Sequence, residues 1–243
     1  MKSIKNLVEY YDELFPVSSL KKSFYSKFAK TCKTPVHFLS VDCGTGFLES
    51  SLAREGHDVT GIENVEELLQ SANLRRRSQL MSIRFFQMEK KDMPKFLGKS
   101  FYNVISVLNS RIMFFTGADS IRDFFITCRK LVAEGGIVVL ETINFEKYGN
   151  SALVQLKTRE SVRAKLFSEI LTSESGTKTI SMNLENSSGK IIPILNNIQV
   201  HPVLPFEIET LAMEAGFSHV EFYGDFDESP FAGNEDFCIS VIS

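Results

Sequence analysis

The stretch from Phe38 to Gln70 constrains the fold more than any other part of the chain. It contains an apolar run of strand type, a turn with Gly44 and Gly46, a helical segment, a second apolar run and then an acid, Glu63. The two glycines let the backbone bend sharply and approach a ligand closely. This order is typical of the first half of a nucleotide-binding α/β domain with a parallel sheet.

Two ligand classes suit this half-domain, namely dinucleotides and S-adenosylmethionine. The start of the helix at Phe47 offers free N–H groups to a carboxylate or phosphate, and Glu63 could accept hydrogen bonds from ribose hydroxyls. A dinucleotide site prefers a third glycine where this chain has Glu49, which disfavours a nicotinamide oxidoreductase. A tight turn followed by a capping Glu63 would give the same local pattern without a ligand.

Length and composition narrow the class of protein. A chain of 243 residues with 43% hydrophobic content can form one large α/β domain with an insertion. The net charge of −3 argues against a nucleic-acid partner. Four scattered cysteines without a CxxC pair favour a reducing compartment and no zinc site. The absence of apolar runs of ~18 residues and of a signal-peptide pattern predicts a cytoplasmic protein without a membrane partner.

The remaining pattern predicts alternating strands and helices. Two helices, over 5–15 and from Ser18 or Ser19 to about Ala29, form an N-terminal helical cap over 1–31. Gly135 and Gly136 are expected to stop a helix before the fifth strand. Helices are expected over 47–54, 65–80, 119–132 and 205–215, and strands over 36–41, 57–62, 82–87, 101–108, 137–142, 220–223 and 237–242. The last two strands are expected to form an antiparallel hairpin at the sheet edge.

Regular alternation stops after the fifth strand. Strand-like runs over 162–171, 177–184 and 190–203 are separated by turn residues, which predicts an antiparallel β flap inserted over 151–204. Such a flap is not stable alone and should lie over the domain. We therefore expect a single domain over 1–243 that includes the cap and the flap.

Polar residues follow several predicted strands. Met88 and Glu89 follow the third strand, Asn109 and Arg111 follow the fourth, and Asn144 follows the fifth. The carboxyl ends of strands in an open α/β sheet meet at the ligand crevice, so these residues are candidates for its lining. A solvated charged loop is the alternative for Glu89.

Several segments together resemble one family, the class I S-adenosylmethionine-dependent methyltransferases. The resemblance is to the branch that acts on small molecules, as glycine and sarcosine N-methyltransferases do. That resemblance implies a Rossmann-like seven-stranded sheet, mostly parallel with the last strand antiparallel, and helices on both faces. The segments that carry it are Tyr11–Pro16, Cys43–Gly46, Gly61–Glu63, Leu131–Gly136, Ala215–Phe217, Gly224–Phe226 and Pro230–Phe231.

The resemblance implies S-adenosylmethionine as cofactor and no metal. The glycine loop would hold its methionine end, Glu63 its ribose, and Met88 with Glu89 its adenine, while Tyr11 would close the site. The implied cofactor contacts are Tyr11, Asp42, Cys43, Gly44, Thr45, Gly46, Glu63, Asn64, Met88, Glu89, Leu108 and Asn109.

Two residues depart from the family loop. Ser40 stands where the family has an acid, and Asp42 stands where it has its first glycine. Asp42 could crowd the cofactor's carboxylate or bind its ammonium group, and we favour the second because the rest of the loop is intact. The first would leave a non-catalytic module that binds the cofactor or a partner.

Methyl transfer from a sulfonium requires a lone pair placed ~3 Å from the methyl carbon and the exclusion of water. A dedicated base is optional if the nucleophile is an amine that binds in its neutral form, so the family resemblance implies an enzyme without identifying a catalytic residue. Tyr11, Arg111 and His201 are candidates, with Asn109 and Asn144 also at the mouth. Arg111 could bind a substrate carboxylate or form a surface ion pair. The implied acceptor is a small molecule with an N or O nucleophile, and a homo-oligomer is compatible with the sequence.

Overall fold

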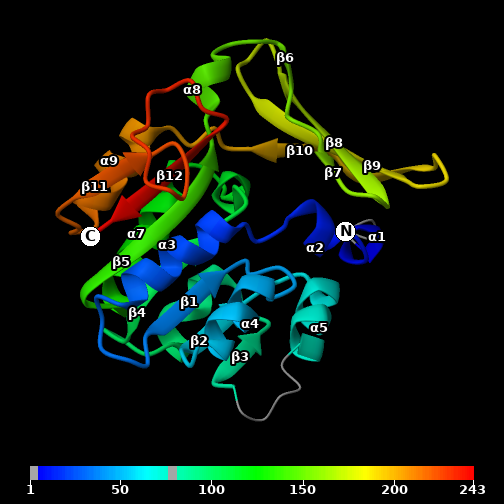
Figure 1. Cartoon of the computed structure of the whole chain (residues 1–243). Helices are drawn as coiled ribbons and strands as arrows, with labels where there is room; N and C mark the ends of the chain where they lie inside the picture. The colour runs from blue at the N-terminus through cyan, green and yellow to red at the C-terminus, as the bar shows by residue number, and fades with distance from the viewer. Residues whose placement is uncertain (1–4, 76–80) are drawn as a thin grey trace.

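The computed structural model describes residues 5–75 and 81–243. A seven-stranded sheet forms its centre, and a smaller antiparallel sheet lies beside it (Figure 1). The large sheet has the order β11-β12-β5-β4-β1-β2-β3, with β12 antiparallel to both neighbours, which confirms the predicted Rossmann-like sheet. Its strands are β1 (His37–Val41), β2 (Asp58–Ile62), β3 (Ile83–Phe86), β4 (Tyr102–Val107), β5 (Val132–Ile143), β11 (Val220–Tyr223) and β12 (Phe237–Ile242).

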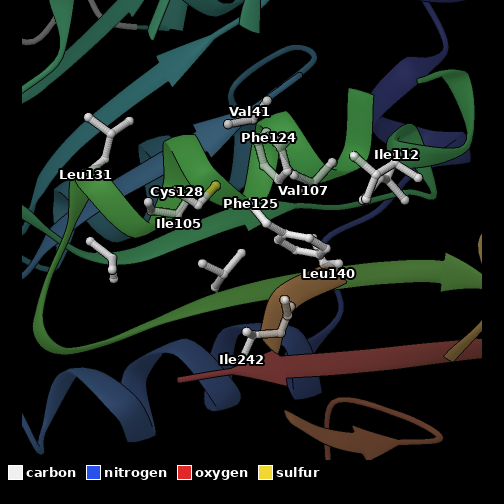
Figure 2. Close-up of a cluster of buried hydrophobic side chains, with 14 of the residues drawn as sticks. Val41, Ile105, Val107, Ile112, Phe124, Phe125, Cys128, Leu131, Leu140 and Ile242 are labelled. Atoms are coloured by element: carbon white, nitrogen blue, oxygen red, sulfur yellow. The ribbon is translucent and has the colours of Figure 1, made fainter. Parts of the chain in front are cut away.

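Helices cover both faces of the large sheet. Successive strand side chains point to opposite faces, so Phe38 packs under one helical layer and Leu39 under the other. Figure 2 shows Phe125 of the second layer near the strand residue Leu140, and Cys128 in the same cluster of buried side chains. The first layer is α3 (Ser19–Ala29), α4 (Phe47–Arg54) and α5 (Glu66–Arg75), and the second is α6 (Met93–Phe96), α7 (Ala118–Leu131) and α9 (Pro205–Glu214). Within the described ranges, no helix combines the length and apolar character needed to cross a membrane.

The N-terminal segment is helical, as predicted, but it is divided. The apolar stripe forms two short helices, α1 (Lys5–Val8) and α2 (Tyr11–Leu14), instead of one. α3 follows, and the Ser18 hydroxyl caps it by accepting a hydrogen bond of 3.1 Å from the backbone N–H of Lys21. The end of the helix predicted over 65–80 lies outside the described residues, since α5 is described to Arg75.

The prediction that Gly135 and Gly136 end a helix is wrong. α7 ends at Leu131 and β5 begins at Val132, so both glycines lie inside the strand. A Cβ on Gly136 would come within 2.8 Å of the carbonyl oxygen of Asn103 on β4. The glycine therefore serves a close strand approach at an irregular point of the β4–β5 pairing.

The inserted sheet is antiparallel, as predicted, and contains more strands than the three expected. β7 pairs only with β8, and β6 and β7 are too short to leave a periodic signal. Its strands are β6 (Leu153–Gln155), β7 (Arg159–Glu160), β8 (Ala164–Thr172), β9 (Lys178–Asn186) and β10 (Ile191–Val200). Its apolar face packs on the N-terminal helices and α5 through Leu7, Tyr11, Leu14, Leu68, Ala164, Leu166, Leu184 and Ile194.

A buried ion pair fastens α3 to the sheet. The Lys21 ammonium lies 2.8 Å from Oε2 of Glu141 on β5, and both side chains are nearly inaccessible to solvent. The same carboxylate accepts a 2.9 Å hydrogen bond from the backbone N–H of Asn109. One carboxylate therefore joins the N-terminal helix, the fifth strand and the turn after the fourth.

A second buried carboxyl group lies in the first turn of α4. Glu49 is 3% exposed. Burial raises its pKa to about 7, although a hydrogen bond with Ser40 works in the opposite direction. The folded protein therefore keeps this proton at pH values where the unfolded chain has released it.

We predict that Lys21→Met lowers the free energy of unfolding by about 3–5 kcal/mol, because it leaves the Glu141 carboxylate buried without a countercharge. Urea unfolding at neutral pH measures this. Lys27→Met is the matched control, since Lys27 lies on the same helix in an exposed pair with Glu228 and should cost less than about 1 kcal/mol. Equal losses in the two variants would contradict the role of the buried pair.

We further predict that Glu49→Gln becomes progressively more stable than the wild type as the pH rises. The folded pKa is raised from 4.5 to about 7, so the wild type loses stability across that window, by about 3 kcal/mol at most. Thermal unfolding at pH 5 and pH 8 measures the difference. The exposed variant Glu66→Gln should follow the wild type, and a Glu49→Gln gain that is equal at both pH values would refute the assignment.

Candidate functional site

The site lies where the strand order changes direction. From β1 the chain continues to β2 and β3 on one side, while β4 and β5 lie on the other. The crevice at the carboxyl ends of β1 and β4 is the expected ligand position in such sheets. A cavity lies there, which we call the loop cavity. Its lining includes Tyr11, Phe15, Lys21, Ser40, Asp42, Cys43, Thr45, Glu49, Leu108 and Asn109.

Left-handed backbone conformations gather at this crevice. Gly44 and Gly46 have φ values of 62° and 69°, and Asp42 has a φ of 54°. Asp42 thus has a left-handed backbone at the position where the resembled family has glycine, and aspartate is one of the few residues that tolerate this conformation. After β4, Asn109 and Ser110 adopt φ values of 53° and 56°. Strain of this kind is characteristic of functional sites.

The Glu63 carboxylate organises the loop. It is 1% exposed and accepts hydrogen bonds from the backbone N–H groups of Gly44, Asn64 and Val65 at 2.8–2.9 Å. The Arg111 guanidinium lies 3.7 Å from its Oε2. A carboxylate has about four acceptor positions, so these three bonds leave room for another donor. Contact between Glu63 and a ribose hydroxyl stays a prediction.

The N-terminal cap closes on the glycine loop. Asp12 accepts a hydrogen bond from the Thr45 hydroxyl and pairs with Arg75, whose Nε donates to the Thr45 carbonyl at 2.9 Å. The Tyr11 ring covers Gly44 so closely that a Cβ there would come within 2.6 Å of the phenol oxygen. Burial raises the pKa of Tyr11 to about 12, so its hydroxyl stays protonated at neutral pH and can act as a donor.

The loop cavity presents both signs of charge. Lys21 contributes an ammonium group, and Asp42 and Glu49 contribute carboxyl groups. Asp42 is paired with Lys90 at 2.8 Å. A zwitterionic amino-acid group is complementary to such a lining, because its two charges can face opposite partners. These residues therefore fit the methionine end of S-adenosylmethionine.

The predicted adenine contacts lie at the same edge of the sheet, after β3. Met88 is half-buried against the main core, and Glu89 is exposed and paired with Lys91. Lys90 begins a short 3-10 helix, η1 (Lys90–Asp92), that brings this segment to Asp42. Contact with adenine stays a prediction for Met88 and Glu89.

The structure brings three mouth candidates together. Tyr11, Asn109 and Arg111 line a second cavity, which we call the cap cavity. Arg111 begins η2 (Arg111–Phe114), directly after the turn that follows β4. Other residues lining the cap cavity are Leu7, Phe15, Leu68, Met113, Phe114, Met182, Ile194 and Leu195.

The other two candidates are engaged in local hydrogen bonds. The Asn144 amide donates to the carbonyls of Gly233 and Glu235 at 2.9 and 3.0 Å, ahead of the short helix α8 (Phe145–Tyr148). Nε2 of His201 lies 2.7 Å from the Glu207 carboxylate on α9. Both side chains thus have partners in the fold, and their roles toward a ligand stay predictions.

A third cavity, which we call the flap cavity, lies between the inserted sheet and the large sheet. Phe15 and Asn109 line the flap cavity, and the same two residues also line the loop cavity and the cap cavity. Its lining also includes Ser110, Met113, Tyr148, Lys157, Arg159, Leu166, Ser168, Asp236 and Phe237.

Sequence reasoning missed several residues of this site. Lys21 carried no signal, because a lysine on an amphipathic helix is normally solvated. Glu141 did carry one, since it interrupts an apolar strand pattern, and Glu49 likewise lies in a segment that buries its neighbours. Such conflicts between local pattern and global fold commonly mark functional or strained positions.

Comparisons with known proteins agree with this geometry. A family model described as a methyltransferase domain matches residues 38–136. The glycine/sarcosine N-methyltransferase of Aphanothece halophytica is 23% identical over 245 residues, covering 98% of this chain and 88% of that protein.

Two solved structures share the fold over nearly the whole length. The CcbJ methyltransferase from Streptomyces caelestis has a TM-score of 0.79 at 20% identity, covering 97% of this chain and 95% of that one. An S-adenosylmethionine-dependent methyltransferase from Clostridium acetobutylicum ATCC 824 has a TM-score of 0.79 at 13% identity, with coverages of 99% and 98%. Residues 38–136 therefore match a methyltransferase domain, and nearly the whole chain has the fold of S-adenosylmethionine-dependent methyltransferases, which supports S-adenosylmethionine as the cofactor.

Proposed function

We propose that this enzyme methylates a small-molecule acceptor at an N or O nucleophile by in-line displacement. One observation carries the proposal: the loop, cap and flap cavities all share Phe15 and Asn109 in their linings. A cofactor in the first and an acceptor in either of the others would meet at these two residues. The relative from Aphanothece halophytica, named a glycine/sarcosine N-methyltransferase, supports a small acceptor.

The loop cavity residues are proposed to hold the cofactor, which supplies an electrophilic methyl group on a sulfonium. Lys21 would face its carboxylate, and Asp42 its ammonium group. Glu63 and Asn64 would bind the ribose. The other proposed contacts are Tyr11, Cys43, Gly44, Thr45, Gly46, Met88, Glu89, Leu108 and Asn109.

Positioning and exclusion of water would supply most of the catalysis. The N-terminal helices and the flap cover the cavities, and Tyr11 closes over the glycine loop. The protonated Tyr11 hydroxyl can donate a hydrogen bond but is a poor base at neutral pH. Asn109, at the junction of the three cavities, is the best-placed residue to orient an acceptor.

The state of Asp42 supports an active enzyme over a non-catalytic module. Its backbone takes the left-handed conformation that the loop requires, and Lys90 balances its charge. An aspartate in this state need not repel the cofactor's carboxylate. The alternative would need a loop that Asp42 distorts or fills.

We also propose a single domain in which the cap over 1–31 and the flap over 151–204 are parts of one folding unit. The cluster of apolar side chains between them supports this. The net charge of −3 and the scattered cysteines support a cytoplasmic protein without a nucleic-acid partner.

We predict that S-adenosylmethionine binds the purified protein in isothermal titration calorimetry and raises its melting temperature. Transfer of a radiolabelled methyl group to a panel of small amines and alcohols tests turnover. If millimolar S-adenosylmethionine produced no binding heat and no thermal shift, the proposal would be refuted. Binding without transfer to any acceptor would favour the non-catalytic alternative.

We also predict that Glu63→Gln weakens S-adenosylmethionine binding by about 10- to 100-fold, because a hydrogen bond to a charged group contributes about 1.5–3 kcal/mol. Calorimetry measures the affinity, and circular dichroism verifies folding. Glu66→Gln, an exposed change at the start of α5, is the matched control and should bind like the wild type. An unchanged affinity in Glu63→Gln would remove Glu63 from the cofactor site.

A further inference from the structure

The flap cavity contains a cation that has no carboxylate partner among the residues that the structure describes. Arg159, on β7, lines the cavity and is largely shielded by Phe15 and Phe237, whose ring centroids lie 4.6 and 5.7 Å from its guanidinium carbon. Among residues 5–75 and 81–243, its one hydrogen bond is a long contact of 3.4 Å from Nη1 to the carbonyl of Leu14. Burial lowers the pKa of Arg159, which reflects the cost of holding a charge there.

Four other cations around the site are matched by carboxylates. Lys21 pairs with Glu141, Lys90 with Asp42, Arg111 with Glu63, and Lys147 with Asp236. Within the part of the chain that the structure describes, no carboxylate lies within ion-pair distance of Arg159. A partly buried guanidinium without a countercharge is costly, and a ligand anion would remove that cost.

A second polar group in the same cavity also has no hydrogen-bond partner in the described part of the chain. Ser110 is 4% exposed, and its hydroxyl makes no hydrogen bond within the described residues. An unsatisfied buried hydroxyl costs about 1–3 kcal/mol, and this one lies on a residue with a left-handed φ of 56°. Ser110 directly follows Asn109, which joins the flap cavity to the loop cavity.

We infer that the methyl acceptor carries a carboxylate, bound in the flap cavity by Arg159 and Ser110. The fork of a guanidinium matches a planar carboxylate, and a serine hydroxyl can donate a further hydrogen bond. The Asp236 carboxylate in the same cavity is already paired with Lys147 at 2.7 Å. Arg111 lies against Glu63, and Lys157 in the flap cavity lining is exposed to solvent, so Arg159 is the shielded cation that remains for the acceptor. This inference rests on the proposed methyltransferase function and adds the acceptor's chemical class.

The test compares carboxylic acids with their neutral amides. Acetate, propionate, glycine and benzoate, and the corresponding amides, are titrated into protein saturated with S-adenosylhomocysteine, and binding is followed by saturation-transfer NMR. We expect at least one acid to bind about 10-fold or more tightly than its amide. Arg159→Met should abolish this ratio, Arg159→Lys should restore part of it, and Ser110→Ala should reduce it.

The control is Arg163→Met, which removes another flap arginine that is exposed and paired with Glu9 and Glu13. It should keep the preference for the acid. Equal binding of every acid and its amide by the wild type, including no binding of either, would overturn the inference, as would a preference that survives Arg159→Met. S-adenosylhomocysteine affinity is measured first in each variant. If the wild type does not bind S-adenosylhomocysteine, the proposed function itself is refuted. If the wild type binds it but binds each acid and its amide equally, the carboxylate site alone is refuted.

Discussion

Hydrogen bonds from backbone amides to two buried carboxylates fix the ligand edge of this sheet. Glu63 holds the glycine loop after β1 and the turn after β2, and Glu141 holds the turn after β4 while it pairs with Lys21. Left-handed turns expose amides that the strands cannot satisfy, and an unpaired buried amide is costly. Glu63 therefore joins the loops after β1 and β2, and Glu141 joins α3, β5 and the turn after β4, on which the position of Asn109 depends.

Much of the fold could be predicted because its signals are local. Apolar strand runs, the glycine turn and the Ser18 cap each depend on a few neighbouring residues, and they predicted the position of each of the seven strands along the chain. The signals failed where one residue type serves two purposes. Gly136 in a strand that approaches β4 closely is indistinguishable, in sequence, from a glycine that stops a helix. Strands as short as β6 and β7 contain too few residues for a period to appear.

The candidate site divides in the same way. The glycine loop and Glu63 follow one another along the chain, so a motif could indicate them. Lys21 and Glu141 are 120 positions apart, and nothing near Lys21 distinguishes it from a solvated lysine. The shielding of Arg159 likewise arises only in the folded chain, where β7 places it between Phe15 and Phe237. Charge pairing over such separations is a property of the folded chain, and local sequence carries little trace of it.

The packing of the N-terminal helices on the inserted sheet has a consequence for ligand traffic. Leu7 and Leu14 of the N-terminal helices pack with Leu166 and Leu184 of the inserted sheet, so these two parts cover the crevice as a single packed unit. A movement of this unit that admits the cofactor would open the flap cavity, the proposed acceptor site, at the same time. The cofactor and the acceptor would then enter and leave through the same opening, and the rate at which it opens would limit the exchange of both ligands.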